Sequence, residues 1–263
     1  MLDLDLSGRR AVVTGASLGI GNAVVRLLAD HGASVAFCAR DGEAVDRLGG
    51  YRPPSGSGRV AGFVADMVDA GSVAAFLAAA EAEGGAADIL VNNVGASPSR
   101  NFLYMSDDDW VQLFELNLMS AVRCTRHCLP HMRAQRWGRV VMVSSGAAWY
   151  PSAALIDYAA TKAAMVATAK ALAGKYGGDG VLVNSVLPGL ILTAMWERAA
   201  AEVGAATGST PEAVLADNAK GVPVGRYGTA EEVAAMIVFL CSNAASYVTG
   251  TSIAVDGGSG GHV

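Results

Sequence analysis

The chain has 263 residues, of which 52% are hydrophobic and 16% are charged, with a net charge of −5 and a pI near 5.3. This acidic balance argues against electrostatic binding of nucleic acid, which requires a basic face. No apolar run is long enough to predict a transmembrane helix, and the acidic N-terminus lacks the basic region of a signal peptide. We therefore expect a cytoplasmic protein that does not bind membranes, with a large core or a buried subunit interface.

Short strand-like runs alternate with amphipathic helix-like runs along nearly the whole chain. The predicted strands are apolar or β-branched and cover Arg10–Thr14, Ser34–Ala39, Arg59–Val64, Asp88–Val91, Gly138–Val143, Val181–Leu187 and Ser252–Val255. The predicted helices are Gly19–His31, Ala70–Glu83, Asp107–Ala134, Asp157–Tyr176 and Thr229–Cys241, with Asp107 and Thr229 as N-caps. The alternation predicts one α/β domain over residues 1–263, with a parallel sheet covered on both faces. Residues 193–225 follow a strand end and are interpreted as a substrate lid within it.

The first predicted strand ends in a glycine-rich turn, in which Gly15, Gly19 and Gly21 follow the pattern G-x3-G-x-G. Glycine lets the backbone approach a pyrophosphate, and the helix that follows offers free N–H groups and a positive dipole end. The position between a strand and a helix favours a dinucleotide site over the alternative, a plain structural turn.

Tyr158 and Lys162 stand one helical turn apart and therefore face the same way. A nearby cation favours the phenolate, so we expect Lys162, together with a cationic nicotinamide, to lower the pKa of Tyr158 toward neutral. Such a phenol can exchange a proton with a substrate oxygen. Ser145 follows a predicted strand at the sheet edge where ligands bind, and we expect its hydroxyl to orient a carbonyl. Ser144 is the alternative, although we expect it to cap the strand end.

A possible metal site needs separate treatment. Cys124, His127, Cys128 and His131 share one face of a predicted helix. Two such pairs could in principle bind zinc, but four ligands on a single helix close a tetrahedral site poorly. We predict no metal and interpret the cluster as part of a subunit interface. The four cysteines show no disulfide framework.

Several of these motifs together carry a resemblance. The glycine turn, Asn92-Asn93-Val94-Gly95, Asn117, Ser145, Tyr158-x3-Lys162 and Pro188-Gly189 resemble the short-chain dehydrogenase/reductase family in order and spacing, from Gly8 to Gly258. The likeness is greatest to the branch that contains the 3-oxoacyl-acyl-carrier-protein reductases. It implies a Rossmann-type doubly wound sheet of about seven parallel strands in the order 3-2-1-4-5-6-7, with helices on both faces. It also implies a homotetramer.

The resemblance implies roles for individual residues. Tyr158 would be the acid/base, Lys162 would bind the nicotinamide ribose, and Ser145 would orient the substrate. Asn117, at an irregularity of its helix, would hold a water that connects Lys162 to solvent. The implied cofactor contacts are Gly15, Ser17, Leu18, Gly19, Ile20, Gly21, Asp66, Met67, Asn93, Gly95, Tyr158, Lys162, Pro188, Gly189, Ile191 and Thr193.

The end of the second predicted strand bears on the choice of cofactor. Ala39 stands where a carboxylate would bind the ribose 2′-hydroxyl of NAD, and the adjacent Arg40 can pair with a 2′-phosphate. We therefore predict NADP(H). NAD remains the alternative because Asp41 is close enough to replace the missing acid.

The predicted substrate pocket is mostly apolar, which favours a neutral carbonyl compound. Its members are Ser97, Trp149, Leu155, Met195 and Trp196; for each aromatic residue, loop packing is an equal alternative. Arg100, Arg133 and Arg136 are the candidates for the basic rim that an acyl-carrier-protein substrate would need. The sequence thus predicts an NADP(H)-dependent oxidoreductase that interconverts a secondary alcohol and a ketone, with Tyr158 as acid/base. The alternatives are an epimerase or dehydratase without net redox change and a non-catalytic cofactor-binding protein.

Overall fold

Seven parallel strands form one sheet in the order β3-β2-β1-β4-β5-β6-β7, as predicted. The computed structural model describes residues 3–54, 56 and 58–260, without the side chains of Ala194 and Met195. The strands are β1 (Arg10–Thr14), β2 (Ser34–Ala39), β3 (Arg59–Val64), β4 (Ile89–Asn92), β5 (Gly138–Val143), β6 (Val181–Pro188) and β7 (Ser252–Val255). Because all of the pairings are parallel, the carboxyl ends of the strands share one edge. The strand order reverses between β1 and β4, where open sheets of this kind bind ligands.

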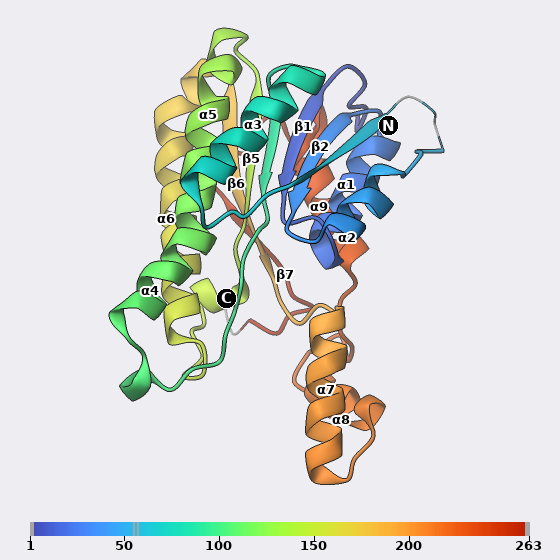
Figure 1. Ribbon diagram of the computed structural model, residues 1–263, viewed down its shortest axis with the longest axis vertical. Helices are drawn as coiled ribbons and strands as arrows, with labels where there is room; N and C mark the ends of the chain where they lie inside the picture. Colours follow the sequence, from blue (N-terminus) through green and yellow to red (C-terminus); the bar gives the residue numbers. More distant parts are fainter. Residues whose placement is uncertain (1–2, 55, 57, 261–263) are drawn as a thin grey trace.

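Helices cover both faces of the sheet (Figure 1). One face carries α1 (Gly19–Asp30), α2 (Gly42–Gly49) and α9 (Ala230–Cys241); the other carries α3 (Ala70–Gly84), α5 (Ser120–Ala134) and α6 (Ile156–Tyr176), with α4 (Asp107–Phe114) packed beside α6. Each face buries its own hydrophobic core against the sheet. None of the described helices is long and apolar enough to cross a membrane.

The predicted helix over Asp107–Ala134 is interrupted. A π-helical turn at Glu115–Met119 separates α4 from α5. The N-cap of α4 is Ser106 rather than Asp107: the Ser106 hydroxyl accepts from the Asp109 amide, and the Asp109 carboxylate accepts from the Ser106 amide. The serine forms this reciprocal capping box, so the N-cap lies one residue earlier than predicted and the helix begins at Asp107.

Most of residues 193–225, the segment interpreted as a lid, folds as a pair of helices. These two helices were not predicted from the sequence. They are α7 (Ala194–Thr207) and α8 (Pro211–Ala219), joined at Gly208, whose φ is +74°. The two helices pack chiefly against each other and project from the carboxyl edge of the sheet (Figure 1). We call residues 194–219 the arm. An edge-to-face contact between Trp196 and Tyr227, with centroids 5.7 Å apart, joins its base to the body.

Candidate active site

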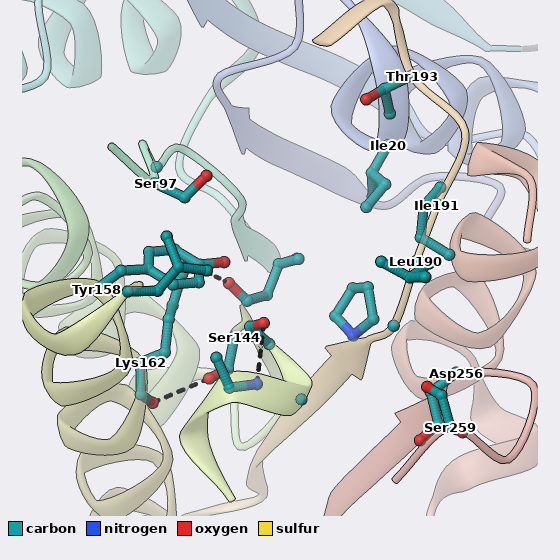
Figure 2. Close-up of a pocket in the computed structure, with 18 of the residues that line it drawn as sticks. Ile20, Ser97, Ser144, Tyr158, Lys162, Leu190, Ile191, Thr193, Asp256 and Ser259 are labelled. Carbon is teal, nitrogen blue, oxygen red and sulfur yellow. Dashed lines mark hydrogen bonds between the residues drawn. The ribbon is translucent and has the colours of Figure 1, made fainter. Parts of the chain in front are cut away.

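A cavity of about 470 Å³ opens at the carboxyl edge of the sheet. Figure 2 shows Ser97, Tyr158 and Lys162 on one side and Leu190, Ile191 and Asp256 on the other. The predicted site residues that line this cavity are Ile20, Asn93, Gly95, Ser97, Ser145, Leu155, Tyr158, Lys162, Pro188, Gly189, Ile191, Thr193 and Trp196. Residues from widely separated parts of the chain thus meet at the edge where parallel α/β sheets bind ligands.

Two hydroxyl groups converge in this cavity. Ser145 is the second residue after β5, and its Oγ accepts a hydrogen bond from the Ala147 amide at 3.1 Å. Tyr158 lies in the first turn of α6, and its side chain hydrogen-bonds to that of Ser145. A carbonyl oxygen placed between these groups could accept hydrogen bonds from both.

Lys162 lies below the tyrosine and is buried. Its Nζ donates to the Val143 carbonyl at 2.8 Å and lies 5.7 Å from the centroid of the Tyr158 ring. Burial lowers the pKa of Lys162 to about 8. Ser144 does not simply cap the strand: its hydroxyl donates to the Lys162 carbonyl at 2.9 Å and ties β5 to α6. The two serines therefore have different roles. The Ser145 hydroxyl faces the cavity, and the Ser144 hydroxyl fixes α6, which carries Lys162.

The pKa of Tyr158 is shifted in the direction opposite to our prediction. Burial of the side chain raises the pKa, and the hydrogen bond from Ser145 only partly offsets this. The phenolate loses its hydration here, while the Lys162 ammonium faces the Val143 carbonyl rather than the hydroxyl. Tyr158 is therefore a protonated phenol at neutral pH, which suits proton donation.

Asn117 occupies the predicted irregularity, the π-helical turn, and is fully buried. Its Nδ2 donates to the Ala96 carbonyl at 3.1 Å and to Thr161 Oγ1 at 3.0 Å, and its Oδ1 accepts from the Ala96 amide at 2.9 Å. The side chain thus fixes the loop after β4 against α6. A Cβ on Gly95 would lie 3.2 Å from Lys162 Nζ and 3.3 Å from Asn117 Oδ1, so this loop passes very close to both.

The glycine turn forms a cradle that larger residues would fill. A Cβ on Gly21 would lie 2.5 Å from the Gly15 carbonyl oxygen, and one on Gly15 would lie 2.8 Å from Val94 Cα. Asn93 Nδ2 holds the turn from the β4 side by donating to the carbonyls of Thr14 and Gly15. The N-terminus of α1 has no side-chain cap, which leaves its amides available to an anion. The turn therefore fits a dinucleotide pyrophosphate.

The ends of β2 and β3 are where we expect the adenine end of a dinucleotide. Arg40 is exposed there, whereas the Asp41 carboxylate caps α2 by accepting from the Ala44 amide. Asp66 is exposed as well, but the Met67 side chain is buried with its sulfur 3.4 Å from Cys38 Sγ. The Met67 side chain therefore faces the core, so any contact of this residue with an adenine would come from its backbone. Val64, the 65% exposed last residue of β3, is the apolar alternative.

The predicted substrate residues are only partly brought together. Trp149 does not line the cavity, whereas its neighbour Tyr150 does; the Met195 side chain lies outside the described residues. The sequence patterns did not predict Asp256 and Ser259 as site residues, yet both line the cavity opposite Tyr158 (Figure 2). The position of Asp256 directly after β7 was the signal that could have identified it, because every other strand that borders the cavity contributes residues from its carboxyl end.

The three candidate rim arginines are engaged in other contacts. Arg100 Nη1 lies 2.9 Å from the buried Asp157 carboxylate, and Arg100 Nη2 lies 3.3 Å from Asp109. Arg133 pairs with Asp179, and Arg136 donates to the Gly178 carbonyl. These pairings leave little free positive charge for an acidic carrier protein.

The cysteine and histidine face of α5 divides between core and surface. Cys124 and Cys128 are buried, while His127 lies 3.1 Å from Glu81 and His131 lies 3.2 Å from Asp88. The imidazoles thus turn toward carboxylates on other elements rather than toward the thiols. Within the part of the chain that the structure describes, no group of three or more metal-ligating side chains is arranged to bind an ion.

Comparison with known proteins agrees with this geometry. The family model described as "Enoyl-(Acyl carrier protein) reductase" matches residues 15–260. The uncharacterized oxidoreductase YvrD of Bacillus subtilis is 39% identical over 98% of both chains. The 3-oxoacyl-[acyl-carrier-protein] reductase FabG of Salmonella typhimurium is 34% identical over 97% of this chain and 98% of its own.

A solved structure is similar over the whole fold. The L-sorbose reductase of Gluconobacter frateurii, crystallised with NADPH and L-sorbose, superposes with a TM-score of 0.95. It is 34% identical in sequence, and the match covers 99% of this chain and 100% of that one.

Proposed function

Because this chain belongs to the short-chain dehydrogenase/reductase family, we propose that it uses NADP(H) to interconvert a ketone and a secondary alcohol, with Tyr158 as the proton donor for reduction. The observation that carries the proposal is the convergence of the Tyr158 and Ser145 hydroxyls above the buried Lys162, in a cavity that adjoins the glycine turn. The protonated state of Tyr158 favours the reductive direction.

The residues present fit a dinucleotide that carries a 2′-phosphate. Gly15, Gly19 and Gly21 leave room for the pyrophosphate, and the α1 amides would bind it. The exposed Arg40 would bind the 2′-phosphate. Asp41, the carboxylate next to Arg40, is committed to capping α2 and so is less suited to select NAD. The NADPH complex of the sorbose reductase supports the same choice.

The bound nicotinamide would supply a hydride to the carbonyl carbon. The chain's own residues supply the proton and the positioning. Ser145 Oγ and the Tyr158 hydroxyl would hold the carbonyl oxygen, and the Tyr158 proton passes to that oxygen as the alcohol forms. The resulting phenolate is stabilised by the Lys162 cation, 5.7 Å from the ring centroid. Asn117 keeps the loop after β4 packed against α6, so this loop and the helix that carries Tyr158 and Lys162 keep their relative positions.

The cavity favours an uncharged substrate. Of the described residues that line it, Lys162 is the sole lysine or arginine, and it is buried behind the tyrosine. Leu155, Leu190 and Trp196 make much of the wall apolar, whereas Ser97, Asp256 and Ser259 could accept or donate hydrogen bonds to hydroxyl groups. We expect neutral ketones, including hydroxyketones, to react better than acyl-carrier-protein thioesters.

The test is a substrate panel assayed by NADPH absorbance, with wild type and Tyr158→Phe side by side. Wild type should reduce at least one neutral ketone and prefer NADPH over NADH. The variant should lose about a thousandfold in kcat, because the phenol is the proton donor, while it keeps its affinity for NADPH.

Two outcomes would contradict the proposal. An active Tyr158→Phe variant would remove the tyrosine from the chemistry. Tight NADPH binding without any absorbance change across the panel would favour an epimerase or dehydratase.

Assembly and location remain predictions. We expect a homotetramer in the cytoplasm. A groove of about 330 Å³ between α5 and α6, lined by Leu129, Thr168 and Leu172 among others, lies on the helices that we expect to pack between subunits. A monomer in gel filtration would contradict the tetramer.

A further inference from the structure

A second cavity, of about 520 Å³, lies between the glycine turn and the arm. Leu18, Gly19 and Gly21 form one wall, and Arg198, Ala199 and Glu202 of α7 form the other. Ile20, Asn93 and Thr193 line both this cavity and the catalytic one, so the two cavities adjoin. The helix of the arm therefore faces the phosphate-binding turn as well as the substrate side.

The wall formed by α1 is built to receive an anion. Leu18 at the N-cap makes no side-chain cap hydrogen bond, and the first turn of α1 contains no acidic residue. Free amides and the positive end of the helix dipole thus face the cavity. The root of the arm lies close by, since a Cβ on Gly19 would be 3.3 Å from Thr193 Cγ2.

The wall formed by α7 offers a cation that is not used elsewhere. Arg198 lines the cavity and is exposed, and among residues 3–54, 56 and 58–260 its guanidinium makes no hydrogen bond or ion pair. Two other cations near the arm are both paired: Lys220 with Asp217 at 2.8 Å and Arg226 with Glu232 at 2.6 Å. An unpaired guanidinium opposite an uncapped helix N-terminus is the second, independent feature that points to an anionic ligand.

We propose that Arg198 binds the pyrophosphate of the dinucleotide from the side opposite the glycine turn, which makes the arm part of the cofactor site. The inference rests on the proposed function, because it needs a dinucleotide in this cleft. A guanidinium can donate two parallel hydrogen bonds to phosphate oxygens. Glu202 stands one helical turn further along the same wall, so its carboxylate opposes the binding of an anion.

The test measures ligand affinity by calorimetry in the full-length protein, without turnover. The ligands are NADPH, ADP-ribose, which keeps the pyrophosphate but lacks nicotinamide and 2′-phosphate, and adenosine 2′-monophosphate, which keeps the 2′-phosphate but has no phosphate on the 5′-oxygen. Arg198→Ala should raise the Kd of NADPH and ADP-ribose about tenfold and leave that of the monophosphate within about twofold. Arg40→Ala should weaken NADPH and the monophosphate but not ADP-ribose.

Further variants sharpen the assignment. Glu202→Gln should tighten NADPH about twofold, because it removes a like charge. Arg198→Lys should recover part of the loss, and added salt should weaken NADPH less in Arg198→Ala than in wild type. Lys220→Ala, a matched control at the exposed residue that follows the arm, should leave every Kd unchanged.

The inference is overturned if Arg198→Ala binds NADPH and ADP-ribose as wild type does. It is also overturned if all three ligands weaken equally, since general damage to the cleft would then explain the loss. Failure of the wild type to bind either NADPH or ADP-ribose would instead refute the proposed function, and this inference with it.

Discussion

The catalytic wall and the arm present their polar groups in opposite ways. We call the side of the cavity formed by Ser144, Ser145, Tyr158 and Lys162, with Asn117 behind them, the catalytic wall. In the wall, Asn117, Ser144 and Lys162 are buried, and each makes hydrogen bonds to backbone or side chains of a neighbouring element. In the arm, Arg198 and Glu202 are exposed and face a cavity, and the two helices pack chiefly against each other. The wall is preorganised before any ligand arrives, whereas the arm has polar groups left for a ligand to engage.

The difference fits the chemistry expected of each region. Proton donation requires the Tyr158 hydroxyl to be placed within fractions of an ångström, which only a packed and hydrogen-bonded surround provides. Holding a dinucleotide requires charge that is free until the ligand binds. Elements that move for ligands come from the less stable parts of a fold. Five substitutions and one pH titration test this contrast.

The largest expected effect is on stability and compares two arginines. Arg100→Ala leaves the buried Asp157 carboxylate without its partner and should cost about 2 kcal/mol of unfolding free energy, or about thirtyfold in the equilibrium constant. Because Arg100 lies in the loop that carries Ser97, kcat/KM should fall as well. Urea titration of the purified variant measures the first effect. Arg198→Ala, the same change in the arm, should cost less than about 0.5 kcal/mol.

Arg100→Lys should retain part of the stability, since an ammonium can pair with Asp157 but cannot reach Asp109 with a second nitrogen. Equal stability of Arg100→Ala and Arg198→Ala would contradict the contrast between the two regions.

The change of kcat/KM with pH should be a smaller effect, and we expect it to depend on the catalytic wall and not on the arm. Burial places the pKa of Lys162 at about 8, below its usual value, so the ammonium is lost as pH rises through that point. The phenolate formed by proton donation then loses its stabilising cation, and kcat/KM should fall about tenfold one unit above the midpoint. The pKa of Tyr158 is raised, so the tyrosine itself remains protonated over this range.

Arg198→Ala serves as the control, because Arg198 lines the second cavity and not the catalytic one that contains Lys162. Its pH profile should have the same midpoint as wild type. A midpoint that moves with the arm variant would assign the titration to the cofactor cleft instead of Lys162.

The same contrast explains what the sequence could predict. Apolar β-branched runs bounded by glycine or aspartate located every strand within one residue, because a strand buried on both faces must be continuously apolar. Motif spacing predicted that Ser145, Tyr158 and Lys162 share one site, and all three line the same cavity. These features depend on local pattern and on a topology with few alternatives.

What the sequence missed depends on three-dimensional surroundings. The direction of the Tyr158 pKa shift follows from burial and from the Val143 carbonyl that engages Lys162, neither of which a four-residue spacing reveals. The burial of the Met67 side chain was not predicted, because adjacent residues after β3 point to opposite sides, one exposed and one buried. The α7 and α8 helices were not predicted because the Gly, Thr and Pro residues between 193 and 225 are typical of a loop, whereas in the structure Gly208 and Pro211 only separate two helices that pack on each other.

The smallest expected effect compares two helix caps of the same type. Thr229 caps α9 in the body by accepting from the Glu232 amide, and Thr210 caps α8 in the arm by accepting from the Ala213 amide, both at 3.2 Å. Replacing either threonine by alanine removes one capping bond, worth about 1 kcal/mol to its helix. In Thr229→Ala that loss should appear in global unfolding, because α9 is part of the core. In Thr210→Ala the global midpoint should stay unchanged, while hydrogen exchange in α8 becomes about fivefold faster, since the arm opens without the body. If both caps shift the global midpoint equally, the arm unfolds with the core, and the contrast in stability between the two regions is wrong.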